Sequence, residues 1–281
     1  MGQINQNLVP FKWLGSKYRL LPWLYQHFPI HNCFVDVFGG SGTVLLHKKP
    51  SKVEVLNDLN FGLINFFLVI QNPETFEQFT ERTQWTLYSR ELFFKYHETW
   101  KEQKDPVEKA YRWWCVARMS YRGVWREKKG LWQTSNTESV NNSKITKDFF
   151  IILHKRLEKV HIENRSFEEI IPLYDHTEAL FYLDPPYPKD TREDQTKMYK
   201  EESTENLHIN LVDLLLNIKG MAVLSGYKTK LYTPLLEAGW RLETKYHHSL
   251  LAKGKESYNE NRVECLYISP RAQGRIQGVL F

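Results

Sequence analysis

The hydrophobic pattern of the chain begins with a buried strand that ends in a glycine-rich turn. An apolar run over 33–37 stops at Gly39, Gly40 and Gly42 and then resumes as the start of a helix. Residues 53–60 form a second apolar run, which ends in polar residues. Two strands joined by a short helix form a right-handed parallel unit, so we expect both strands to end at the same edge of a sheet.

The middle of the chain has a helical and aromatic pattern. Residues 74–118 carry this pattern and lead into the stretch YRGVWREKKGLWQT, where Gly130 and a basic run separate two Trp-bearing segments in the manner of a hairpin. The pattern differs from the strand and helix alternation on either side. We therefore expect an inserted, largely helical lobe here.

The alternation of strands and helices resumes after residue 160. It predicts a strand, turn and helix at 160–171, an apolar strand at 179–188 that ends abruptly at Asp184, and a helix capped by Ser203 or Thr204. A strand then follows in MAVLSGY, and alternating residues between Trp240 and Ser269 predict two antiparallel strands. The fold class is α/β, with a doubly wound, mixed and mostly parallel sheet finished by a hairpin.

Length and composition limit the class of protein. The 281 residues can hold one large α/β domain, or a catalytic domain with an inserted lobe. No apolar run approaches the roughly 20 residues that span a bilayer, and the N-terminus lacks the layout of a secretory signal. Cys33, Cys115 and Cys265 are scattered singly, so we expect neither a disulfide framework nor a structural metal. These features predict a cytoplasmic protein.

Basic residues gather in one window of the chain. The net charge of +5 permits a polyanionic partner without requiring one. Residues 109–132, however, hold seven basic side chains against the single acid Glu127. Basic residues clustered with few acids are typical of proteins that contact a phosphate backbone.

The glycine turn and the acid after the second strand together indicate a nucleoside site. A turn without side chains lets a ligand approach the backbone, and Asp58 lies where an acid can accept hydrogen bonds from ribose hydroxyls. The turn lacks the Lys-Ser/Thr ending of a phosphate-binding loop. Taken singly, the glycines fit a structural turn equally well, and Asp58 is better explained as a solvated aspartate at a strand end. Together they fit S-adenosylmethionine, which needs no phosphate site.

The tetrapeptide DPPY at 184–187 carries the most specific chemistry. Two prolines directly after a strand cannot continue a ladder, so they turn their carbonyls outward. The Asp184 carboxylate and the Pro185 carbonyl can then accept hydrogen bonds from an exocyclic amine, beside Pro186, while the Tyr187 ring offers a stacking face for a base. Accepting these hydrogens restores electron density to an amine nitrogen that is otherwise delocalised into its ring.

Four motifs in order give the chain a family resemblance. FKWLGSK (11–17), DVFGGSG (36–42), NDLN (57–60) and YLDPPY (182–187) resemble the signature of Dam-like N6-adenine DNA methyltransferases of the alpha group. The resemblance implies a Rossmann-like S-adenosylmethionine-dependent fold with an inserted DNA-recognition lobe. It also implies cofactor contacts from the residues that match the motifs: Lys12, Trp13, Gly15, Lys17, Asp36, Phe38, Gly39, Gly40, Asp58 and Asp184.

One segment departs from the family pattern. Many relatives carry an aspartate near the cofactor's adenine in the segment equivalent to ENRSFEEI, whereas Ser166 occupies that position here, followed by Glu168 and Glu169. We keep Ser166 as the candidate contact at this place. The contacts to the cofactor's adenine are the part of the site that the resemblance leaves open.

The basic lobe resembles the family's DNA-contacting hairpin. MSYRGVWREKKGLW (119–132) is similar to the Arg- and Gly-containing hairpin of that lobe. We expect DNA contacts from Arg118, Arg122, Arg126, Lys128 and Lys129, with Tyr199 added by the loop from Lys189 to Glu202. Arg122 and Arg126 are our candidates for reading bases. Trp113 and Trp114 are more simply explained as core residues of the lobe.

The full prediction is a site-specific DNA adenine methyltransferase that uses S-adenosylmethionine and flips the target base out of the duplex. The catalytic domain spans 1–73 and 148–281, and the target-recognition lobe spans 74–147. We expect a monomer on double-stranded DNA with no metal and no membrane, in a bacterial or phage-encoded protein; a cognate restriction enzyme is a further candidate partner. The alternatives are N4-cytosine methylation, an RNA or protein-amide substrate, and a catalytically silent DNA-binding relative.

Overall fold

The computed structural model describes residues 7–121, 132, 146–186, 205–247 and 262–275. Its strands form one seven-stranded sheet in the order β3-β2-β1-β4-β5-β7-β6. The pairs β2–β3, β1–β4 and β4–β5 are parallel, whereas β7 is antiparallel to both β5 and β6. The predicted fold class, a mixed and mostly parallel sheet finished by an antiparallel hairpin, is therefore confirmed.

By its internal contacts the chain divides into two compact units, one formed by 1–21 with 39–166 and the other by 22–38 with 167–281. The predicted boundaries of the catalytic domain and the lobe differ from this division and stay a prediction. Among its described residues, the first unit contains two strands, eight helical segments and the glycine turn; these elements are η1 (Tyr18–Leu20), α2 (Thr43–His47), β2 (Val53–Asn57), α3 (Phe61–Gln71), α4 (Pro73–Gln84), α5 (Arg90–Thr99), η2 (Trp100–Glu102), α6 (Pro106–Met119), α7 (Lys147–Leu157) and β3 (Val160–Glu163).

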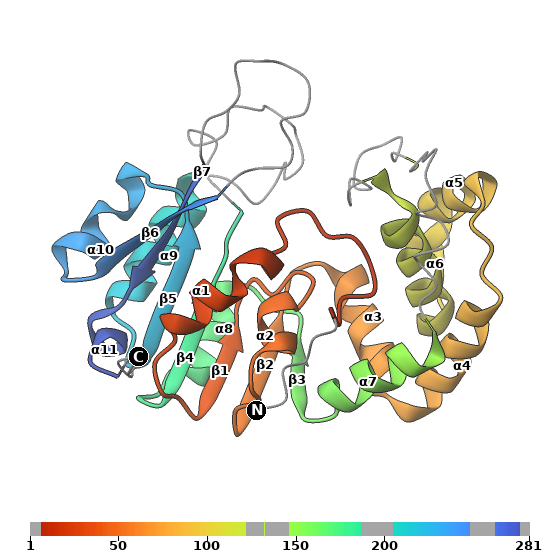
Figure 1. Cartoon of the computed structure of the whole chain (residues 1–281), viewed down its shortest axis with the longest axis horizontal. Coiled ribbons are helices and arrows are strands. Elements are labelled where there is room, and N and C mark those ends of the chain that lie inside the picture. The colour runs from red at the N-terminus through yellow and green to blue at the C-terminus, as the bar shows by residue number, and fades with distance from the viewer. Residues whose placement is uncertain (1–6, 122–131, 133–145, 187–204, 248–261, 276–281) are drawn as a thin grey trace, which may run out of the picture. The chain divides into compact units, whose positions relative to one another are not determined.

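Polar caps start the helices of the first unit. Asn72 and Asp105 accept hydrogen bonds from the backbone N–H groups of α4 and α6, and each is followed by a proline at the first helical position. Helices α3, α4, α6 and α7 pack together, and α5 packs on α6 (Figure 1). Trp113 and Trp114 of α6 are buried, which confirms them as core residues.

The second unit contains the other five strands. Its elements are most of α1 (Leu21–Gln26), then β1 (Cys33–Asp36), α8 (Phe167–Tyr174), β4 (Ala179–Leu183), α9 (Glu205–Leu216), β5 (Met221–Gly226), η6 (Lys230–Tyr232), α10 (Thr233–Glu237), β6 (Arg241–His247), β7 (Arg262–Ile268) and α11 (Pro270–Gln273). Every residue of β1, β4 and β5 is buried. Continuous apolar runs of this kind are typical of parallel strands covered on both faces.

Candidate cofactor and target-base sites

The glycine turn of the first unit leaves no room for a side chain at its centre. Gly40 has a φ of 50°, and a Cβ added to it would lie 2.7 Å from Nε1 of Trp13. Gly42 also has a positive φ, of 69°, directly before α2. The hydroxyls of Ser16 and Thr43 are 3.1 Å apart, so the N-terminal motif contacts the turn at a second point. The structure therefore brings Trp13 against Gly40, as two parts of one predicted site.

Asp58 holds this turn in place. Its two carboxylate oxygens accept hydrogen bonds from the backbone N–H groups of Gly40 and Asn60, each at 2.8 Å, and the N–H of Gly39 donates to the carbonyl of Asn57 at 2.8 Å. The prediction gave Asp58 a ribose contact alone; its role in shaping the turn comes from the structure.

The segment that carries Ser166 is tied to the end of β2. The side-chain amide of Asn57 donates to the carbonyl of Arg165, and its oxygen accepts from the N–H of Arg165, both at 3.0 Å. The side chain of Asn164 donates to the carbonyl of Asp58 at 2.7 Å. Ser166 itself is half-buried. Asn57 was not among the predicted site residues, although a polar residue at the end of a buried strand was a usable signal.

A buried ion cluster fixes the other end of α2. Glu54 of β2 contacts Lys48 at 2.7 Å and Arg156 of α7 at 2.6 Å, and Arg156 also donates to the carbonyls of Leu45 and Leu46. Burial alone raises the pKa of Glu54, but hydrogen bonds and charges from Arg156 and Lys48 bring it below the ordinary value. The helix that begins at the glycine turn is thus clamped at its C-terminus.

Lys12 and Arg118 lie close together in the same unit. The guanidinium of Arg118 is 5.2 Å from the ring centroid of Trp114. Burial, and then the positive charge of Arg118, lowers the pKa of Lys12, and burial lowers the pKa of Arg118. The prediction placed Lys12 with the cofactor and Arg118 with DNA. Two neighbouring, partly buried cations provide an environment that favours an anion. Of the remaining N-terminal candidates, Gly15 is exposed and Lys17 is buried.

In the second unit, β1 places Asp36 beside the strand that ends in DPPY. Asp36 pairs in register with Tyr182, and the N–H of Val37 donates to the carbonyl of Tyr182 at 3.0 Å. Asp36 is 1% exposed, whereas Asp184 is half-buried. Phe38 follows, with its ring 5.9 Å from that of Phe167.

Of the DPPY segment itself, Pro185 is buried and Pro186 is half-buried. Tyr187 lies outside the described residues.

A buried histidine that the prediction did not include contacts this segment. His208 of α9 is 0% exposed, and its Nε2 lies 3.0 Å from the carbonyl oxygen of Pro186. Its Nδ1 lies 2.8 Å from the hydroxyl of Tyr232. The signal in the sequence was its position on the buried face of α9, with Leu211, Val212 and Leu215.

Comparison with known families decides the class. The model of the D12 class N6 adenine-specific DNA methyltransferase matches residues 13–263, nearly the whole chain, and so includes both the glycine turn and DPPY. The chain belongs to this class. The resemblance inferred from four motifs is thereby confirmed.

Individual relatives match over shorter stretches. The DNA adenine methylase of Escherichia coli K12 is 27% identical over 125 residues, which cover 44% of this chain and 45% of the relative. The DNA adenine methylase of Serratia marcescens is 27% identical over 128 residues, covering 44% and 46%. The Type II methyltransferase M.CviBI of Paramecium bursaria Chlorella virus NC1A is 23% identical over 186 residues, covering 63% and 67%. The match thus spans less than half the length of the bacterial relatives.

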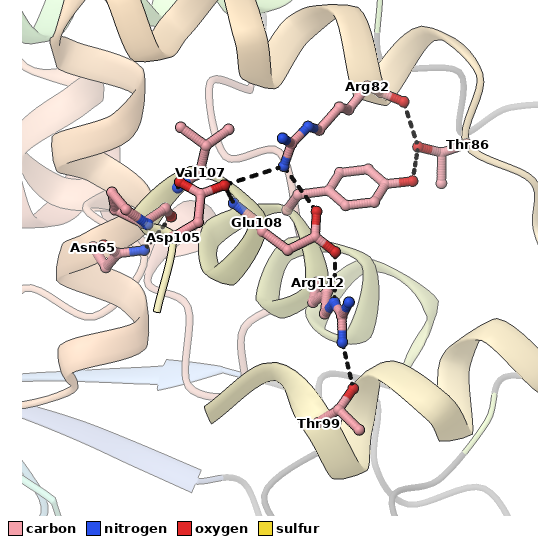
Figure 2. A network of polar contacts seen from close by, with 10 residues as sticks. Asn65, Arg82, Thr86, Thr99, Asp105, Val107, Glu108 and Arg112 are labelled. Atoms are coloured by element: carbon pink, nitrogen blue, oxygen red, sulfur yellow. Dashed lines mark hydrogen bonds and ion pairs between the residues drawn. The ribbon is translucent and has the colours of Figure 1, made fainter. Parts of the chain in front are cut away.

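In this D12-class chain the helical region contains an extensive polar network. Glu108 of α6 accepts hydrogen bonds from Arg82 at 2.8 Å and from Arg112 at 2.6 Å, and Arg112 also donates to Thr99 (Figure 2). The guanidinium of Arg112 lies over the ring of Tyr96, 5.3 Å from its centroid. Arg112, one of the seven basic residues in 109–132, therefore forms contacts within the protein and links α6 to α5.

The expected hairpin is only partly described. Ser120 forms an antiparallel bridge with Trp132, as two arms of a hairpin would. The other candidate DNA contacts, Arg122, Arg126, Lys128, Lys129 and Tyr199, lie outside the described residues.

Three further observations concern the described part of this methyltransferase-class chain. No group of three or more His, Cys, Asp or Glu side chains there is arranged to hold a metal ion. In the same ranges, no helix combines the length and the apolar character needed to cross a membrane. Cys33, Cys115 and Cys265 are buried and are not joined in a disulfide.

Proposed function

We propose that this chain transfers a methyl group from S-adenosylmethionine to the exocyclic N6 amine of an adenine flipped out of duplex DNA. The observation that carries the proposal is the family match over residues 13–263, because it includes both halves of the chemistry in one chain. The names of the bacterial relatives, DNA adenine methylase, support adenine over cytosine. The proposal is for a site-specific enzyme that acts as a monomer in the cytoplasm, with a cognate restriction enzyme as a candidate partner.

The cofactor half of the proposal rests on the glycine turn. A turn in which Gly40 has no room for a Cβ, and whose Gly40 N–H is held by Asp58, fits a ligand that approaches the backbone closely. When bound, S-adenosylmethionine supplies a methyl group activated by its sulfonium sulfur. The proposed contacts are the motif residues Lys12, Trp13, Gly15, Lys17, Asp36, Phe38, Gly39, Gly40, Asp58, Ser166 and Asp184.

The target half of the proposal rests on DPPY. Asp184 is half-buried and directly follows β4, so it lies at the carboxyl end of that strand. We assign it, with the Pro185 carbonyl, to accept the two N–H bonds of the adenine amine and so raise the nucleophilicity of its nitrogen. Pro186 follows in the same segment, and Tyr187 is assigned to stack on the flipped base.

The methylation test uses a plasmid from a methylase-free host. DNA from cells that express the chain is sequenced for modified bases, beside Asp184→Ala and the matched Asp213→Ala, which removes an exposed carboxylate of α9. We expect modified adenine within one short sequence, lost with Asp184→Ala and kept with Asp213→Ala. Modified cytosine in place of modified adenine would contradict the adenine specificity and support the N4-cytosine alternative. Unmodified DNA, with folded protein that binds DNA, would refute the proposal in favour of a silent relative.

The DNA-binding part of the proposal assigns phosphate contacts to Arg118, Arg122, Arg126, Lys128 and Lys129, and a further contact to Tyr199. Arg118→Gln tests it, because each lost phosphate contact lowers the slope of log affinity against log salt by about 1. Arg112→Gln removes the same charge from the same helix but at an internal ion pair. We expect a lower slope for Arg118→Gln alone; equal slopes for both variants would contradict the assignment.

A further inference from the structure

His208 links three separate elements of the second unit. It lies on α9, its Nε2 is 3.0 Å from the Pro186 carbonyl after β4, and its Nδ1 is 2.8 Å from the Tyr232 hydroxyl at the end of η6. We propose that His208 is a positioning residue for the target base, holding the Pro186 carbonyl and so fixing the orientation of the segment 184–186. The inference rests on the proposed function, because it assigns a role in presenting Asp184 and the Pro185 carbonyl to the base.

The hydrogen bonds define the protonation of the imidazole. A carbonyl oxygen can only accept, so Nε2 carries the proton and donates to Pro186. In the neutral ring Nδ1 is then an acceptor, and it receives the hydroxyl hydrogen of Tyr232. His208 is 0% exposed, and a buried neutral ring with both nitrogens satisfied carries no desolvated charge. The relay therefore runs in one direction, from Tyr232 through His208 to Pro186.

The far end of the relay is anchored in the core. Tyr232 is 1% exposed, and its ring lies edge-on to that of Tyr267 on β7, with the centroids 5.0 Å apart. Helix α9 packs on both η6 and α10. The hydroxyl bonded to His208 Nδ1 thus belongs to a residue that packs against β7. Because the Tyr232 ring is packed in the core, its hydroxyl can hold the His208 ring in one position.

Pro186 needs an external bond because of the sequence around it. Pro185 and Pro186 have no backbone N–H, so the segment cannot hold itself by donating to a neighbouring strand. A hydrogen bond from His208 to the Pro186 carbonyl supplies an anchor from outside the segment. His208 therefore acts two residues after Asp184, the residue assigned to the amine.

Two amide variants distinguish positioning from packing. The amide nitrogen of Gln matches the reach of Nε2 and can donate to Pro186, whereas the shorter Asn reaches only toward Tyr232. We expect His208→Asn to lower the single-turnover methylation rate by about 10- to 100-fold, and His208→Gln to recover most of it. The rate is measured per cofactor-binding site counted by calorimetry, so a loss of folded protein changes the number of sites and not the rate. Cofactor affinity should stay within about threefold in both variants.

Tyr232→Phe provides a second measurement that keeps the ring and its packing. It removes the hydroxyl bonded to His208 Nδ1, and we expect a several-fold lower rate with unchanged cofactor affinity, whether or not His208→Asn folds. Rates equal to the original for His208→Asn, or for Tyr232→Phe when the Asn variant does not fold, would overturn the inference. An original chain that methylates no DNA would instead overturn the proposed function, and this inference with it.

Discussion

Replacing Gly40 by alanine tests whether the glycine turn and Trp13 form one rigid site. Two costs are expected from the structure. A φ of 50° disfavours a side chain by about 1–2 kcal/mol. The added Cβ would also lie 2.7 Å from Trp13 Nε1, and such overpacking costs about 1–3 kcal/mol. Gly40→Ala should therefore lower the free energy of unfolding by about 2–5 kcal/mol.

The assay is urea unfolding of four variants, because the two costs separate in a double-mutant cycle. In a Trp13→Ala background the collision is absent, so Gly40→Ala should cost only the backbone strain of about 1–2 kcal/mol. Gly239→Ala is the matched control: its φ is 86°, and the nearest atom, a Pro270 side-chain carbon, would be 3.8 Å away. It should lose about 1–2 kcal/mol of stability and no cofactor affinity.

The result that would refute this reasoning is an equal cost of Gly40→Ala with and without Trp13. A coupling below about 0.5 kcal/mol would mean that the indole moves aside freely and does not define the turn. Cofactor affinity, measured by calorimetry, supplies an independent readout. If half of the expected cost appears there, about 1–2.5 kcal/mol, the affinity falls by about 5- to 70-fold.

Three other variants test the packing behind the two sites, each by urea unfolding. Gly62→Ala adds a Cβ 2.6 Å and 2.7 Å from two buried indoles, so we expect a loss of about 1–3 kcal/mol despite the better helix propensity of alanine, and a gain would contradict the packing. Glu54→Gln leaves the Arg156 guanidinium buried without its carboxylate and should cost about 3–5 kcal/mol at pH 7. Because the pKa of Glu54 is lowered in the folded state, its contribution is present above the ordinary pKa and is lost as the pH falls through the lowered one; the unfolding free energy of the Gln variant should depend less on pH there. Asn57→Ala removes both hydrogen bonds to the backbone of Arg165 and should lower the free energy of unfolding by about 1–3 kcal/mol. An unchanged free energy of unfolding would contradict this role of Asn57.

The strands could be predicted from the sequence because burial on both faces leaves a continuous apolar run. The predicted runs at 33–37, 53–60 and 179–188 each contain an observed strand, Cys33–Asp36, Val53–Asn57 and Ala179–Leu183. The strands end one, three and five residues before these runs do, at Asp36, Asn57 and Leu183. After Leu183 the cause is visible in the sequence, because Asp184 is followed by two prolines, which lack the N–H that a ladder needs.

The sequence identified the residues of the motifs, but it could not predict which hydrogen bonds and ion pairs they form. Asp58 was expected to face a ligand, yet its oxygens also hold the turn through Gly40 and Asn60. Arg112 was counted with the basic window, yet it is paired with Glu108. Periodicity and composition report which side chains are buried or charged. Which partner each one meets depends on how segments far apart in sequence are placed, and that information is absent from a local pattern.

The position of His208 shows that a helical pattern can also predict the presence of tertiary hydrogen bonds. Within α9 it shares the buried face with Leu211, Val212 and Leu215, at the spacing of successive helical turns. A polar ring on an apolar face costs free energy unless both nitrogens are bonded, so its presence alone predicts tertiary hydrogen bonds. The sequence thus predicts that His208 has hydrogen-bond partners, and the structure identifies them as Tyr232 and Pro186. That one partner is the carbonyl of Pro186 connects this helix to the segment assigned to the target base.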